Sequence, residues 1–146
     1  MSDIVHATAD FKYREFAASS APAAVRESIK LLCVNVLQPL RDAIGKEVIV
    51  TSGYRPQDSD SDHRLGQAAD IKVECMSSQV LAAFLATVLP RRQMDPATPP
   101  PYDQLIWYDA PDTHVHVGWR GPRNRGMILH AVKPPSGKTQ YLWEKP

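Results

Sequence analysis

The longest run of helical periodicity lies between residues 22 and 45. Apolar side chains recur there every three or four positions, at Val25, Ile29, Leu32, Val36 and Leu40. This spacing predicts an amphipathic helix that begins at Pro22 and turns one face toward the core. Pro39 lies inside the pattern and predicts a kink or a restart, and Gly45 predicts the end of the helix. A second helix is predicted to begin at Ser77-Ser78, because serine hydroxyls cap helix N-termini.

Four segments have the short, β-branched or alternating composition of strands: residues 47–52, 68–73, 102–108 and 113–119. Residues 9–20 predict a short helical turn or a docking arm. No repeat and no internal boundary is visible, so we expect one α+β domain, residues 1–132, with helices packed on a small, mainly antiparallel sheet. The tail, residues 133–146, is a linker by composition, and its Tyr141-Leu142-Trp143 segment is expected to dock back on the domain or onto a partner.

Composition sets outer limits on function. The 146 residues suffice for one domain with a proper core and are few for two. A net charge of +1 gives no electrostatic case for a nucleic-acid partner or an anionic membrane. No apolar run approaches the length that crosses a bilayer, and the N-terminus has no signal-peptide pattern, so we expect synthesis in a cytoplasm. The sequence has two cysteines, Cys33 and Cys75, which allow at most one disulfide bond.

Two histidines and an aspartate give the clearest chemical signal. His63 lies in a polar loop, Asp70 follows seven residues later at the start of a strand, and His116 lies on a distant strand. Two imidazoles and one carboxylate are what a catalytic zinc ion takes from a protein when a fourth position stays open for water. Because alternate residues of a strand share a face, His114 points with His116, as does Asp112 if the strand begins that early. The pattern indicates a hydrolase that activates water on a metal. The alternative is that these are ordinary polar residues on the surface of a sheet, with no metal bound.

Several motifs occur in chain order: Ser52-Gly53-Tyr54-Arg55, Ser61-x-His63-x-x-Gly66-x-Ala68-x-Asp70, Asp103-Gln104-Leu105-Ile106 and His114-x-His116. Together they resemble the zinc D-Ala-D-Ala carboxypeptidase family. That family includes phage and bacterial peptidoglycan carboxypeptidases and endopeptidases and shares its fold with the Hedgehog signalling domain. Shorter similarities at residues 16–19 and 36–41 extend the resemblance over roughly residues 10–125.

The resemblance implies a role for each matched residue. His63, Asp70 and His116 match the zinc ligands. Arg55 matches an arginine near the substrate carboxylate or the polarised scissile carbonyl, where a guanidinium offers paired donors; tying its loop to the sheet is the structural alternative. Ser61 matches a serine that binds substrate or holds the His63 loop. His114 or Arg55 would stabilise the developing oxyanion, and Gly66 would serve the turn between the first two ligands.

The proton acceptor is where the sequence departs from the family pattern. Relatives have a glutamate soon after the Asp-Gln-Leu-Ile strand, or an acidic residue three positions before the last ligand. Those places hold Tyr108 and Thr113 here. Asp109 and Asp112 each lie one residue away, and either is a candidate for the catalytic base. If neither serves, the domain keeps zinc and has lost catalysis.

The expected function follows from the resemblance. It implies a zinc metallopeptidase of carboxypeptidase or endopeptidase type that hydrolyses an amide bond adjacent to D-alanine in the peptidoglycan stem peptide. A phage lysis enzyme (an endolysin) or a virion-associated domain fits the small size, and would act on the cell wall after release. The alternative is a catalytically impaired, zinc-stabilised structural or binding module of a phage tail or baseplate, with phage tail proteins as partners. A third hypothesis is that the protein is a dipeptidase that acts on free D-Ala-D-Ala in the cytoplasm.

Overall fold

Strands with alternating burial form the central layer of the molecule. The computed structural model describes residues 5–57, 61–89, 100–109, 113–132 and 137–144. Six strands form one sheet in the order β3 (Ile49–Ser52), β4 (Ala68–Lys72), β6 (Val115–Gly118), β5 (Gln104–Tyr108), β7 (Met127–Val132) and β8 (Gln140–Glu144). All neighbouring strands are antiparallel except the parallel pair β5 and β7. The α+β class with a mainly antiparallel sheet is therefore confirmed.

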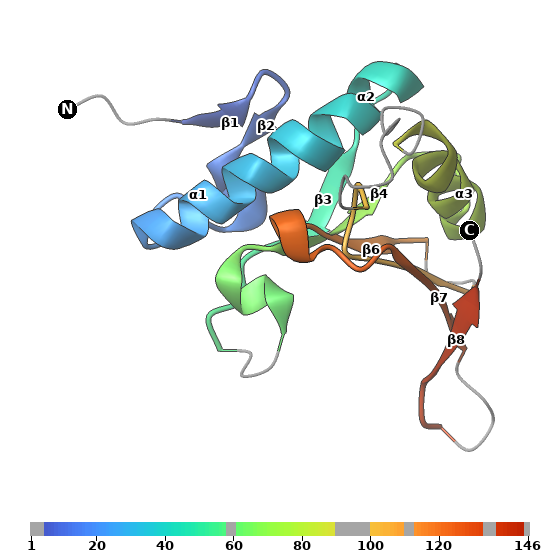
Figure 1. Ribbon diagram of the computed structural model, residues 1–146. Coiled ribbons are helices and arrows are strands. Elements are labelled where there is room, and N and C mark those ends of the chain that lie inside the picture. Colours follow the sequence, from blue (N-terminus) through green and yellow to red (C-terminus); the bar gives the residue numbers. More distant parts are fainter. Residues whose placement is uncertain (1–4, 58–60, 90–99, 110–112, 133–136, 145–146) are drawn as a thin grey trace.

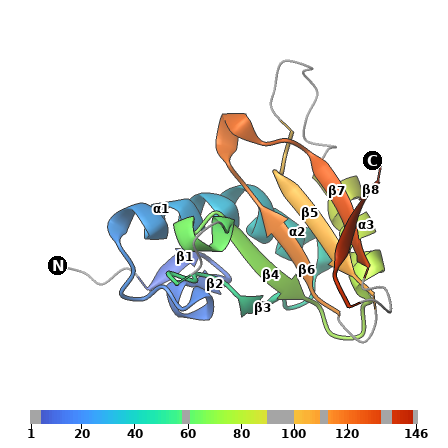
Figure 2. The ribbon, with the colours of Figure 1, turned by 90° about the horizontal axis from the view of Figure 1, so that it is seen from below.

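Helices cover one face of this sheet. They are α1 (Ala23–Leu32), the π-helical segment η2 (Cys33–Leu37), α2 (Gln38–Ile44) and α3 (Ser78–Val88). The predicted kink is the π-helical segment, after which Pro39 lies in the first turn of α2, where its missing N–H is tolerated. Gly45 ends α2 with a φ of 70°, and the Ser77 hydroxyl accepts from the backbone N–H of Val80 at the start of α3. Figure 2 shows the helices behind the sheet, so the opposite face of the sheet is open.

Alternation assigns each strand residue to one of these two faces. Apolar residues of β4, β6 and β5 pack under the helices in the main core: Ala69, Ile71, Val115, Val117, Leu105 and Trp107. Their neighbours along each strand, including Asp70, His116 and Ile106, therefore lie on the open face. Ile106 joins Leu129 and Ala131 of β7 in a second, smaller apolar cluster. The open face thus carries polar side chains on its β4–β6 half and apolar ones toward β7.

Both ends of the chain contain strands that were not predicted, beside a helical turn and a docked tail segment that were. Residues 9–20 contribute β2 (Phe11–Lys12) and the 3-10 helix η1 (Tyr13–Phe16), and β2 pairs with β1 (His6–Thr8) in a separate two-stranded sheet (Figure 1). Residues 127–132 and 140–144, which were not predicted as strands, pair with each other as β7 and β8. The β8 segment therefore docks back onto the sheet.

The state of the cysteines and the character of the helices can be compared with the expectations from the sequence. Cys33 and Cys75 are both free thiols; burial raises the pKa of Cys33, whereas Cys75 is exposed. Within the described parts of the chain, no helix has the length and apolar character that crossing a membrane requires.

Candidate metal centre

The pairing of β4 with β6 brings two of the candidate ligands together. Asp70 and His116 are direct partners in the antiparallel register, so their side chains leave the same face at neighbouring positions. The His116 Nδ1 atom lies 3.2 Å from the Asp70 Oδ1 atom. The register of β4 with β6 is thus sufficient to place two of the three candidate ligands.

A tight turn delivers the third candidate ligand. The 3-10 helix η3 (Asp62–Leu65) carries His63, and its first turn is capped by Ser61, whose hydroxyl accepts from the His63 backbone N–H at 3.1 Å. Gly66 ends η3 with a φ of 73°, and a Cβ there would lie 2.7 Å from the carbonyl oxygen of Val25. Only glycine fits this turn, which returns the chain to β4 and leaves His63 with 1% of its surface exposed.

The backbone fixes the orientation of the His63 ring. The Nδ1 atom lies 2.7 Å from the carbonyl oxygen of Gly53. Since a carbonyl oxygen only accepts, Nδ1 carries the proton and the Nε2 lone pair faces the other two ligands. Gly53 makes this contact possible because a Cβ at that position would lie 2.5 Å from the Cα of Phe16.

The three donor atoms have the spacing of a tetrahedral site. His63 Nε2 lies 3.2 Å from His116 Nδ1 and 3.4 Å from Asp70 Oδ1. Bonds of about 2.0–2.1 Å to a tetrahedral zinc ion place its ligands about 3.3 Å apart. Burial acts to raise the pKa of Asp70, but the facing imidazoles of His116 and His63 outweigh it and hold the pKa below its ordinary value, so the carboxylate is ionised, as a metal ligand must be. The residues present therefore fit a zinc ion with a fourth position open.

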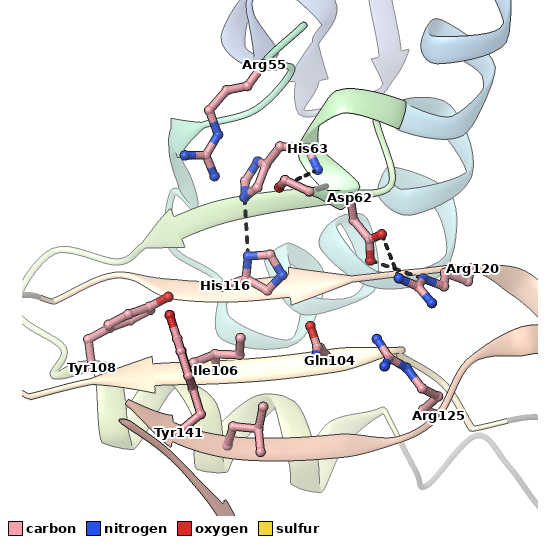
Figure 3. A pocket seen from close by; sticks show the side chains of 12 residues that line it. Arg55, Asp62, His63, Gln104, Ile106, Tyr108, His116, Arg120, Arg125 and Tyr141 are labelled. Carbon is pink, nitrogen blue, oxygen red and sulfur yellow. Dashed lines mark hydrogen bonds and ion pairs between the residues drawn. The ribbon is translucent and has the colours of Figure 1, made fainter. Parts of the chain in front are cut away.

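A groove of about 540 Å³ runs along the open face beside the three ligands. Gln104 and Ile106 of β5 lie in it below His63 and His116 (Figure 3). Tyr108 and Tyr141 line one end, and two arginines line the other. The volume is within the range of small-molecule and peptide sites.

A family model described as Peptidase M15 matches residues 9–97, which is 89 of the 146 residues. The chain belongs to the peptidase M15 family. M15 peptidases are zinc-dependent, and membership supports a metallopeptidase for peptidoglycan-type substrates. The match includes His63 and Asp70 but ends before His116, so the place of the third ligand in this M15 chain comes from the sheet register. No curated protein and no solved structure matches the chain.

Two other candidate residues of this M15 peptidase lie beside the ligands. Arg55 lines the groove, with its Nη2 atom 3.8 Å from Asp70 Oδ2, and its backbone N–H donates to the carbonyl of His63. It is therefore placed both to reach a substrate and to tie its loop to η3. Ser61 also lines the groove, while its hydroxyl caps η3.

The candidates for acid–base chemistry are placed differently. Asp109 does not line the groove: its Oδ1 atom lies 2.7 Å from Nε2 of His130, whose ring stacks on Trp107 at 3.5 Å on the face that bears the helices. The His114 ring stacks on Tyr108 at 4.3 Å. Asp112 lies outside the described residues. Among the residues that the structure does describe, the only carboxylate lining the groove belongs to Asp62, which is paired with Arg120.

An ion-pair network that the sequence analysis missed supports the site. Asp103 is fully buried and accepts from Arg125 through the backbone N–H, Nε and Nη2 at 3.1, 2.9 and 2.8 Å. The Arg120 Nε atom lies 3.2 Å from Asp103, and its Nη2 atom donates to Asp62 at 2.7 Å. Burial acts to raise the pKa of Asp103, but these arginines outweigh it and lower the pKa. The network ties η3 to the sheet. In the sequence, the network is signalled by the acid that opens Asp103-Gln104-Leu105-Ile106.

Proposed function

We propose that the protein is a zinc-dependent peptidoglycan peptidase that hydrolyses an amide bond adjacent to D-alanine in the stem peptide. The observation that carries this proposal is the tetrahedral spacing of the His63, Asp70 and His116 donor atoms beside an open groove that His63 and His116 line. M15 membership supplies the substrate class, and the resemblance to D-Ala-D-Ala carboxypeptidases supplies the bond.

Each residue near the ligands contributes a defined task. When bound, zinc supplies Lewis acidity, which polarises the scissile carbonyl and lowers the pKa of water. Gly53 holds the His63 ring so that Nε2 faces inward. Arg55 offers guanidinium donors beside Asp70, where they stabilise the charge that develops on the carbonyl oxygen or bind a substrate carboxylate. His114 is a second candidate for the oxyanion, and Ser61 a candidate for substrate binding.

Asp112 is the proposed proton acceptor. It is an even number of positions from His114 and His116, so continued alternation would direct it to the same face. A carboxylate there would take a proton from the attacking water and pass it to the leaving amine. Asp109 is a weaker candidate, because its carboxylate is engaged by His130.

The resemblance also supports a biological setting. A phage lysis enzyme or a virion-associated domain would meet peptidoglycan after release from the host cytoplasm. The Hedgehog-type fold is part of the same proposal, since it is implied by the same motifs.

One observation favours a second candidate function, a zinc-stabilised binding module of a phage tail or baseplate. The family's glutamate position holds Tyr108, which lines the groove, and the one groove-lining carboxylate among the described residues is neutralised by Arg120. A chain that has lost its proton acceptor would retain the metal as a structural element.

Digestion of purified peptidoglycan distinguishes the two functions. Zinc-loaded protein, a chelated sample, Asp112→Ala and the matched control Asp109→Ala are incubated with walls of several types, and released fragments are identified by mass spectrometry. The peptidase predicts fragments that end at D-alanine, lost on chelation and in Asp112→Ala but retained in Asp109→Ala. No fragments from protein that carries stoichiometric zinc would contradict it and favour the binding module.

A further inference from the structure

The end of the groove away from the tyrosines is lined by two arginines to which the proposed hydrolysis gives no task. Arg120 follows β6 and Arg125 precedes β7, and Figure 3 shows their guanidinium groups at the same end of the groove, beyond Gln104. Both lie outside residues 9–97, the part of the chain that the M15 family model matches. Their task is therefore open to inference from this structure.

Both guanidinium groups are held in place from beneath. The fully buried carboxylate of Asp103 binds Arg125 through Nε and Nη2 and contacts Nε of Arg120. Asp62 binds Arg120 from the side of η3. A guanidinium that is fixed in advance loses little conformational entropy when it binds a further anion.

Donors remain available to a ligand. Arg120 and Arg125 are 32% and 42% exposed, whereas Asp103 has no exposed surface. Among the described residues, neither arginine has a hydrogen-bond partner at its Nη1 group. This end of the groove therefore presents N–H donors of two guanidinium groups, although each arginine is paired with a carboxylate and Asp62 also lines the groove. Such donors suit the planar, bidentate geometry of a carboxylate.

The distance to the ligands fits a peptide that carries this carboxylate. Arg120 lies four positions after His116, just beyond the end of β6, which corresponds to at most about 13 Å along the chain. An extended peptide advances about 3.3–3.6 Å per residue, and both side chains have reach of their own. A carboxylate about two to four residues from the bond at the metal would thus meet the arginines.

We propose that Arg120 and Arg125 form an anion subsite, which binds a free carboxylate of the peptide substrate on one side of the scissile bond. The proposal rests on the proposed function in placing the scissile bond at His63, Asp70 and His116. It makes Arg125 a specificity-determining residue and predicts that amidation of the substrate carboxylate weakens binding.

The test compares two synthetic stem peptides, L-Ala-γ-D-Glu-L-Lys-D-Ala-D-Ala with the α-carboxylate of D-Glu either free or amidated. The zinc-loaded full chain is titrated with each by calorimetry, while mass spectrometry follows cleavage; where a peptide is cleaved, KM replaces Kd. We expect the free acid to bind at least about tenfold more tightly. The preference should shrink with added salt, since charged groups at a surface are screened.

Two variants test whether the preference for the free acid depends on Arg125. Arg125→Gln should bind both peptides equally, whereas Arg123→Gln, which removes the same charge from an exposed position of the same loop, should keep the preference. Equal binding of both peptides, or of neither, by wild-type protein would overturn the subsite, as would a preference retained by a folded Arg125→Gln. If that variant fails to fold, the wild-type comparison still decides. Cleavage without an acid preference rejects the subsite alone, and an acid preference without cleavage rejects the peptidase alone.

Discussion

Two clusters of histidine and aspartate lie on opposite faces of the same sheet. On the open face, the donor atoms of His63, Asp70 and His116 lie 3.2–3.4 Å from one another, and the side chains are 1–14% exposed. On the face that bears the helices, His130 and Asp109 make one contact of 2.7 Å, and Asp109 is 54% exposed. The residue types are the same, but the first cluster has three converging donors, and the second has two among the residues that the structure describes.

The difference shows what separates a metal site from an ion pair. The Gly53 carbonyl accepts a hydrogen bond from the Nδ1 N–H of His63 and so leaves the Nε2 lone pair for a metal. In the second cluster the ring nitrogen of His130 is used by Asp109 itself, and the ring is held by stacking on Trp107. A metal site thus depends on a backbone acceptor and on strand register, in addition to the nearness of histidine to a carboxylate.

The largest effect is expected from removing one donor of the first cluster. His63→Ala should lower zinc affinity by more than about 100-fold, because even changes to residues that orient a ligand cost 10–100-fold. His130→Ala removes the same side chain from the second cluster and should leave zinc content unchanged. Metal analysis after dialysis measures both. Full zinc retention by His63→Ala would show that the ligand assignment is wrong.

The turn that delivers His63 can be tested with a pair of glycines. Gly66→Ala should destabilise the protein by about 3 kcal/mol, because it combines a left-handed φ with a close approach to backbone. Gly45→Ala has a similar φ and nothing within 4 Å of the added carbon, so about 1 kcal/mol is expected. Chemical denaturation gives both values. Equal losses would mean that the close approach at Gly66 has no energetic weight.

The buried Asp103 predicts a dependence of stability on pH. Its folded pKa is lowered, so its contribution is complete above the unfolded carboxyl pKa of about 3.9 and is lost as pH falls through the folded value. Asp103→Asn should therefore lose about 2 kcal/mol at neutral pH and less in acid. Unfolding free energies across this range provide the check, and a variant that tracks the wild type at every pH would contradict it.

The smallest effect is expected from the second cluster. Asp109→Asn removes one member of an exposed pair, and such pairs contribute about 1 kcal/mol or less. Neither zinc content nor cleavage of peptidoglycan should change. A loss of cleavage with zinc retained would make Asp109 the proton acceptor after all.

The sequence allowed part of this comparison to be predicted. The strands that carry Asp70 and His116 follow from alternation, and His63 follows from the motif around Gly66. The direction of Asp109 did not, since it depends on a stack between Trp107 and His130 that only tertiary structure creates. Strand β8 was missed because the residues between it and β7 have a linker composition, although the two strands follow each other in the chain. The ion-pair network of Asp103 was not predicted, because ion pairs between distant loops leave no periodic pattern in the sequence.

Anomalous diffraction at the zinc edge, on crystals of the zinc-loaded protein, tests most directly whether the open face holds the metal. We predict one strong peak, bonded to His63 Nε2, Asp70 and His116 Nδ1 at about 2.0–2.2 Å, with a fourth position facing the groove. A peak at His130 and Asp109, or no ordered zinc between the three residues, would contradict the metal centre and the function built on it.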